Sequence, residues 1–202
     1  MIYSYWLGRL PLFSVVLSAL LLTGASHVLA AELIRYQETA VITKSHEEVL
    51  TALLDYGNWC EKGCKYNSPG VVVDEKLAPR QKPDHFYTWT WISDIKDTKY
   101  FSEITVKRAA DATTIESRAL MRGEQALIDE LKKATGRVHD VLFDTSVNLV
   151  TLRALPAAGG HAQTQVTFST TVTVSGFLAM FPEKMRKGLK ESTQAVFAAL
   201  RK

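Results

Sequence analysis

The chain has 202 residues, 47% of them hydrophobic and 22% charged, which suffices for one well-buried domain and is short for two. It carries 24 Lys and Arg against 21 Asp and Glu, a formal net charge of +3, and contains no block of like charges. This balance argues against a strongly basic nucleic-acid-binding protein and against an acidic disordered tail, so we expect no nucleic-acid partner.

Residues 1–30 have the composition of a secretory signal peptide. Arg9 lies in the amino-terminal part, residues 10–24 (LPLFSVVLSALLLTG) are apolar almost throughout, and small or modest side chains precede the expected cleavage point. The apolar run is shorter than the roughly 20 residues that span a bilayer comfortably. We predict a signal peptide cleaved after Ala30 and a periplasmic or secreted mature protein. The alternative is an uncleaved signal anchor, lengthened by the aromatic residues within positions 3–6.

The mature chain begins with a predicted strand and a short helix. Residues 33–42 (LIRYQETAVI) mix β-branched and aromatic side chains with polar ones, which is typical of a strand. Ser45 and Glu48 then have the spacing of a capping box, and apolar residues at helical spacing follow. We predict a helix that ends near residues 56–57.

Cys60 and Cys64, the two cysteines of the chain, lie in the segment WCEKGCKY. Export would place them in an oxidising compartment, where disulfides persist. We predict a local bridge that fixes the shape of a small loop. Two free thiols are an alternative. A zinc site would need further ligands, and a redox pair is more usually spaced Cys-x-x-Cys.

Four further segments have the patterns of strands, at residues 71–77, 85–92, 100–107 and 114–121. In the second of these, HFYTWTWI, alternation places His85, Tyr87, Trp89 and Trp91 on one face, which is therefore aromatic. The pattern predicts neighbouring antiparallel strands with one wetted face and one covered face.

The remaining elements are an inserted helix, more strands and a closing helix. Residues 123–135 (GEQALIDELKKAT) place apolar residues at helical spacing before Gly136, which indicates a short amphipathic helix between strands. Strands are expected again at residues 141–143, 148–155 and 163–174. Pro182 occupies a favoured position for the start of a final helix.

This order of elements, with SHEEVLTALLDYGNW at the first helix, resembles the START-like (SRPBCC) superfamily, which includes polyketide cyclases, coenzyme Q-binding proteins and lipid-transfer domains. The resemblance covers residues 32–202. It implies an α+β helix-grip fold, in which a curved antiparallel sheet wraps around a long C-terminal helix, in one domain at residues 31–202. The helix at 123–135 and the cysteine loop depart from the family pattern. The residues that carry the resemblance are Val49, Leu53, Leu54, Asp55, Tyr56 and Trp59, followed by the closing helix from Phe181.

The resemblance also implies a cavity between the sheet and the C-terminal helix, which the superfamily uses for lipids, sterols, quinones and polyketide-like molecules. The strand pattern agrees, because an aromatic face with few polar groups is typical of an apolar pocket. The alternative is that the aromatic side chains fill a solid core. The helix at 123–135 is expected either as a lid over the cavity or as the cover of a sheet edge. The expected ligand-binding residues are Tyr87, Trp89, Trp91, Tyr100, Ser102, Ser117, Phe168 and Thr170.

Candidate catalytic groups are few. His85 is the one histidine on the expected cavity face, and no nucleophile, oxyanion donor or second carboxylate can be placed near it by spacing. The sequence has no metal-ligand cluster or phosphate-binding loop, so we expect no catalytic residue, cofactor or metal site. Glu116 and Arg118 fall on the opposite, outer face, where a surface ion pair is expected.

These observations predict an exported START-like binding protein that carries or senses a hydrophobic small molecule, such as a lipid, quinone or polyketide-like compound. Transient contact with a membrane is expected, and the oligomeric state is open. One alternative is an enzyme of the cyclase or dehydratase type on the same fold, with His85 as its base. Another is an interaction protein with a filled core.

Overall fold

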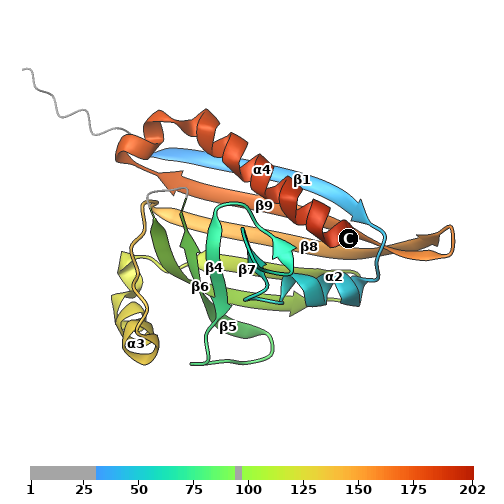
Figure 1. Ribbon diagram of the computed structural model, residues 1–202, viewed down its shortest axis with the longest axis horizontal. Helices are drawn as coiled ribbons and strands as arrows, with labels where there is room; N and C mark the ends of the chain where they lie inside the picture. The colour runs from blue at the N-terminus through green and yellow to red at the C-terminus, as the bar shows by residue number, and fades with distance from the viewer. Residues whose placement is uncertain (1–30, 94–96) are drawn as a thin grey trace, which may run out of the picture.

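A curled antiparallel sheet forms the body of the protein, and a long C-terminal helix lies across it (Figure 1). The computed structural model describes residues 31–93 and 97–202; the predicted signal peptide, residues 1–30, lies outside the described residues. The seven strands follow the order β1-β9-β8-β7-β6-β5-β4. Their bounds are β1 (Glu32–Ile42), β4 (Val71–Lys76), β5 (His85–Ile92), β6 (Thr98–Arg108), β7 (Thr113–Ala119), β8 (Thr145–Ala158) and β9 (His161–Val174).

Helices and a small strand pair complete the architecture. α2 (His46–Leu53) follows β1, α3 (Gln125–Thr135) follows β7, and α4 (Pro182–Arg201) closes the chain. Between α2 and β4, the parallel pair β2 (Trp59–Cys60) and β3 (Tyr66–Asn67) forms a separate short sheet. Short 3-10 helices precede α3 and α4, at Arg122–Glu124 and Gly176–Met180. The fold is the α+β helix-grip fold that the sequence predicts.

Local sequence signals set the helix boundaries. The predicted capping box is confirmed, because the Glu48 N–H donates to Ser45 Oγ (3.3 Å) and the Ser45 N–H donates to Glu48 Oε2 (2.8 Å). Pro182 is the first residue of α4. Gly136 ends α3 with a φ of 69°, a left-handed conformation that glycine adopts without strain. α2 ends at Leu53, before the expected residues 56–57.

The inner face of the sheet packs against α2 and α4. Val49 and Leu50 of α2 and Phe197 and Leu200 of α4 are buried in one apolar cluster with the strands. Removing these large side chains from water supplies the main driving force for closing the helices onto the sheet. The buried strand residues of this cluster are Ile42, Phe86, Ile104, Val106, Ile115, Val150, Leu152 and Val166.

Part of the outer face of the sheet, on β5 and β6, is covered by α3. Ile128 and Leu131 of this helix are buried against Tyr87, Trp89 and Phe101 of β5 and β6. The predicted inserted helix therefore exists, and it packs on the outer face beside β4 and β5, so it is not a lid over the inner face. It shields an aromatic surface that would otherwise be a large exposed apolar patch.

Two further differences from the sequence-based expectation concern connections. Residues 141–143 do not form a strand; the chain there makes only an isolated bridge, Lys99 with Asp140. β8 and β9 are each longer than expected and form a hairpin whose turn contains Gly159 and Gly160.

Within residues 31–93 and 97–202, no helix has the length and apolar character needed to cross a membrane.

Candidate functional site

A pocket of about 150 Å³ lies between the inner face of the sheet, α4 and the segment that connects α2 to β4. Its wall is predominantly apolar, with a few polar side chains, which is the composition of small-molecule sites. A cavity of about this volume holds a single aromatic ring in another protein. The lining residues are Leu53, Tyr56, Trp59, Ser68, Asp74, Ile115, Ser117, Asn148, Val150, Phe168 and Val196.

One polar wall of the pocket comes from neighbouring strands of the sheet. Directly opposed residues on antiparallel strands point to the same side, and the register places Ser117 opposite Asn148 and Asn148 opposite Thr170. The Thr170 hydroxyl donates to Asn148 Oδ1 at 2.8 Å. This bond fixes the orientation of the amide, so its NH₂ group remains available as a donor on the inner face.

Asp74 is a second polar group of the pocket, at the middle of β4. The register pairs Asp74 with Thr90, whose hydroxyl donates to Asp74 Oδ1 at 2.9 Å. The pKa of Asp74 is raised to about 7, chiefly by burial and to a smaller extent by the neighbouring Glu75, against the bond from Thr90, which lowers it. No basic side chain among the described residues pairs with this carboxyl group.

Two tyrosines surround Asp74. Tyr56 lines the pocket and packs edge-on against Phe86, with ring centroids 5.6 Å apart. Tyr100 is opposite Thr90 in the register and packs edge-on against Phe143. Burial, together with the nearby Asp74 carboxylate, raises the pKa of each phenol well above its usual range. Both hydroxyl groups therefore stay protonated at physiological pH.

Trp59 connects the pocket wall to the end of α2. Its indole Nε1 donates to the Ala52 carbonyl at 2.8 Å, which satisfies one of the last carbonyl groups of the helix. The ring is buried and stacks on Tyr66 at a centroid distance of 4.5 Å. Asp55 accepts a bond from Asn58 Nδ2 at 2.9 Å, which closes the turn after α2. The contacts of Asp55 and Trp59, two of the residues that carry the family resemblance, are thus those of turn formation and packing.

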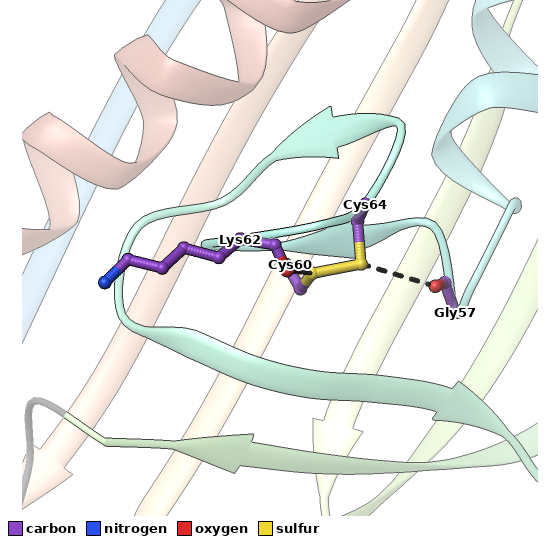
Figure 2. Close-up of a disulfide and its surroundings, with 4 residues drawn as sticks. All are labelled: Gly57, Cys60, Lys62 and Cys64. Carbon is purple, nitrogen blue, oxygen red and sulfur yellow. Dashed lines mark hydrogen bonds between the residues drawn. A yellow bond between two sulfur atoms is a disulfide. The ribbon is translucent and has the colours of Figure 1, made fainter.

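The predicted disulfide forms directly after Trp59. Cys60 and Cys64 are bonded, with their Cα atoms 5.4 Å apart, and the Cys64 sulfur lies 3.6 Å from the Gly57 carbonyl oxygen (Figure 2). The Lys62 side chain extends away from the bridge. The bridge holds the loop between β2 and β3, and these strands position Trp59 and Tyr66.

The expectation that the predicted site residues share one face is wrong for three of them. Tyr87, Trp89 and Trp91 lie on the outer face: Trp89 is opposite Phe101 in the register, and both are buried with α3. Trp89 also donates from Nε1 to the Val138 carbonyl (2.8 Å), and Trp91 bonds to Asp97. Alternation identifies two faces of a strand but not which of them turns inward.

The other five predicted residues lie on the inner face. Ser117 and Phe168 line the pocket. Thr170 supports it through its bond to Asn148, and Tyr100 lies beside Asp74. Ser102 is buried on the same face without lining the pocket.

His85 lies on the outer face, so it cannot serve as a base in the inner pocket. Its Nε2 is 2.8 Å from Glu103 Oε1, and it lines a separate surface pocket with Arg80, Gln81, Lys82 and Tyr87. This position removes the candidate base of the cyclase or dehydratase alternative.

Arg118 takes part in the same outer-face network. It pairs with Glu103 (2.5 Å) and Glu124 (2.8 Å), and not with Glu116 as the sequence suggested. Glu116 is two residues away along the strand, roughly 6.6 Å, whereas Glu103 is directly opposite on β6.

Sequence reasoning missed Asp74, Tyr56 and Asn148 as pocket residues. Asp74 follows three valines in VVVDEK, and such a run shows no alternation that would assign the carboxylate to a face. Asn148 begins a correctly predicted strand segment, and only its pairing with β7 and β9 reveals its position. Within the part of the chain that the structure describes, no group of three or more His, Cys, Asp or Glu side chains is placed to hold a metal.

Comparison with known proteins identifies solved structures of similar fold, and no similar sequence. No protein-family model and no curated protein sequence matches the chain. Among solved structures, the chain is similar to a STAR-related lipid transfer protein fragment from Xanthomonas axonopodis, with a TM-score of 0.59, 16% identity, and coverage of 83% of this chain and 86% of that chain.

Two further structures show the same similarity. The ZhuI aromatase/cyclase from Streptomyces sp. R1128 has a TM-score of 0.52 and 13% identity, covering 84% of this chain and 92% of that chain. A START superfamily protein from Mycobacterium smegmatis has a TM-score of 0.51 and 13% identity, covering 83% and 94%. At such low identity the similarity shows a common fold alone.

Proposed function

Since the chain has the START-like fold, we propose that it binds a hydrophobic small molecule in the pocket between the sheet and α4, and carries or senses that molecule. The pocket itself is the observation that supports this function. Its apolar wall, with Leu53, Ile115, Val150, Phe168 and Val196, is interrupted by a few hydrogen-bonding groups that can orient a ligand.

The names of the similar structures agree with this ligand class. One is a STAR-related lipid transfer protein and another an aromatase/cyclase, so lipids and polyketide-like ring compounds are the first candidates, with quinones as a third. A pocket also favours binding over the alternative of an interaction protein with a filled core.

The proposed setting is the periplasm or the cell exterior. The composition of residues 1–30 and the disulfide between Cys60 and Cys64 both support export, because such bridges persist in oxidising compartments.

Transient membrane contact is part of the same proposal. Phe177, Met180 and Phe181, in the 3-10 turn directly before α4, are 59%, 57% and 41% exposed. Lys184 and Lys187 follow in the first turns of α4, are exposed, and would face anionic headgroups. Co-sedimentation with vesicles of anionic and of neutral lipid tests this contact, and equal absence of the protein from both pellets would contradict it.

The binding function is tested by extraction and by blocking the pocket. Protein purified without detergent should release an apolar compound into organic solvent, detected by mass spectrometry. The purified protein should also enhance the fluorescence of the uncharged dye N-phenyl-1-naphthylamine. Val196→Phe, which fills the pocket, should abolish this enhancement, whereas Val41→Phe is a matched control at an exposed valine on β1. An empty extract together with dye binding unaffected by Val196→Phe would contradict the proposal.

A further inference from the structure

Asp74 is a carboxyl group without a cationic partner in a largely apolar pocket. Thr90 Oγ1 donates to Oδ1 at 2.9 Å, and no salt bridge to this carboxyl group forms among the described residues. Because the pocket is lined by Asp74 itself, a bound molecule can reach this carboxyl group. An apolar ligand that enters the pocket displaces water from the carboxyl group, so a ligand that supplies a hydrogen-bond partner in its place avoids a loss of affinity that a hydrocarbon incurs.

The groups that face Asp74 from other elements are uncharged at neutral pH. Tyr56 from the α2–β4 segment and Tyr100 from β6 remain protonated, and Thr90 from β5 is a neutral hydroxyl. The charged neighbours on β4 are Glu75, which disfavours a second negative charge, and Lys76, whose Nζ lies over the Phe86 ring at 4.0 Å. The pKa of Asp74, raised to about 7 by burial, agrees with a neutral carboxylic acid below neutral pH.

We propose that Asp74 acts as a neutral hydrogen-bond donor that selects ring-sized apolar ligands carrying a carbonyl oxygen over hydrocarbons of the same shape and over amines. This inference rests on the proposed function, because it concerns the same pocket. A protonated carboxyl group donates one O–H bond, and a carbonyl oxygen accepts it without bringing a donor of its own. An amine would instead require the ionised carboxylate as its counter-ion.

Three compounds with one carbon skeleton distinguish these cases. Acetophenone carries a carbonyl group, ethylbenzene has a methylene group in its place, and 1-phenylethylamine carries an ammonium group. Their dissociation constants are measured by NMR titration of the purified, disulfide-bonded protein at pH 5.5 and pH 8.5, with amide shifts of pocket residues such as Ser117 and Asn148 locating the site.

At pH 5.5 acetophenone should bind about tenfold more tightly than ethylbenzene, the gain typical of one good hydrogen bond. The preference should shrink at pH 8.5, where Asp74 is ionised. Asp74→Asn keeps an N–H donor and should retain the preference at both pH values. Asp74→Val should bind the two compounds equally at both. Asp111→Asn, at an exposed aspartate, is the control and should behave as the wild type.

The other outcomes contradict either the role of Asp74 or the proposed binding function. Equal binding of acetophenone and ethylbenzene to the wild type at pH 5.5 would overturn the role of Asp74 and leave the proposed function intact. Tightest binding by 1-phenylethylamine, strengthening with pH, would overturn the neutral-donor role by identifying Asp74 as a counter-ion. Failure of all three compounds to bind would contradict the proposed function and this inference together.

Discussion

At the scale of single residues, Asp74 makes the stability of the fold depend on pH. Its pKa is about 7 in the folded state, against about 3.9 for an aspartate in an unfolded chain. Between these values the folded protein keeps a proton that the unfolded chain releases. The stabilisation is therefore complete below about pH 4 and is lost as the pH rises through about 7.

Asp74→Asn should consequently stabilise the protein more at pH 8 than at pH 4, because the amide cannot acquire the buried charge. The expected difference is about 1 to 3 kcal/mol, or several degrees in Tm, because solvent reaches the half-buried side chain and screens part of the effect of its charge. Thermal unfolding followed by circular dichroism at the two pH values measures it. A Tm difference between variant and wild type that does not change with pH would contradict the assignment.

His139 should act in the opposite direction. Its Nδ1 accepts a bond from the Phe101 N–H at 3.1 Å, and its ring stacks on Phe101. Burial lowers the pKa of His139, and Lys132 lowers it further. As the pH falls below about 6.5, the unfolded chain takes up a proton that the folded state resists, so stability declines with acid.

His139→Gln should flatten this decline. The variant cannot be protonated, so its Tm should fall less than that of the wild type between pH 7.5 and pH 5.5. Thermal unfolding followed by circular dichroism at these two pH values tests this prediction. His161→Gln, at an exposed histidine, is the control. Parallel Tm curves for His139→Gln and the wild type would show that this histidine contributes nothing to the acid response.

At the scale of elements, the sequence predicts the strands and helices well and their relative placement less well. The capping box, the helix before Gly136 and the strand at residues 85–92 all depend on neighbours in sequence. Which face of β5 turns inward depends on its register with β6 and on where α3 lands. Long-range pairing and packing leave no periodic signal in the sequence. The pattern alone therefore places Tyr87, Trp89 and Trp91 together but does not show that their face turns away from the cavity.

The two faces should respond differently to truncation. Leu131 of α3 is fully buried on the outer face, so Leu131→Ala should cost about 2 to 5 kcal/mol of stability and leave dye affinity unchanged once the protein is folded. Phe168→Ala opens the inner pocket and should weaken dye binding at least several-fold. Tm and dye titration on both variants measure these effects. Loss of affinity in Leu131→Ala, at a temperature where it is folded, would contradict the division of faces.

The disulfide should affect both properties modestly. Closing so short a loop stabilises by about 2 kcal/mol in the chain-entropy model. The double variant Cys60→Ser, Cys64→Ser should lose about 4 to 8 °C in Tm and bind the dye more weakly, because the loop positions Trp59 in the pocket wall. The wild type treated with reductant should reproduce both changes, whereas unaltered affinity would limit the bridge to a stabilising role.

At the scale of the whole molecule, the position of the first strand bears on the proposed cleavage after Ala30. β1 begins at Glu32, which pairs with Val174 of β9. Cleavage after Ala30 therefore leaves the edge strand whole, whereas cleavage several residues later would remove part of its pairing. We expect mass spectrometry of the exported protein to give a first residue of Ala31. A retained amino terminus would favour the signal anchor instead.

The volume of the pocket has a kinetic consequence. About 150 Å³ is half of the roughly 300 Å³ at which drug-sized ligand sites begin. A single ring fits in this volume, but the larger naphthylamine dye or a long acyl chain requires that the walls, with Val196 of α4 among them, move apart before the ligand can enter or leave. Residence time for large ligands would then depend on this opening of the walls, and not on contacts alone. A small ring compound should exchange rapidly, and a lipid slowly, from the same site.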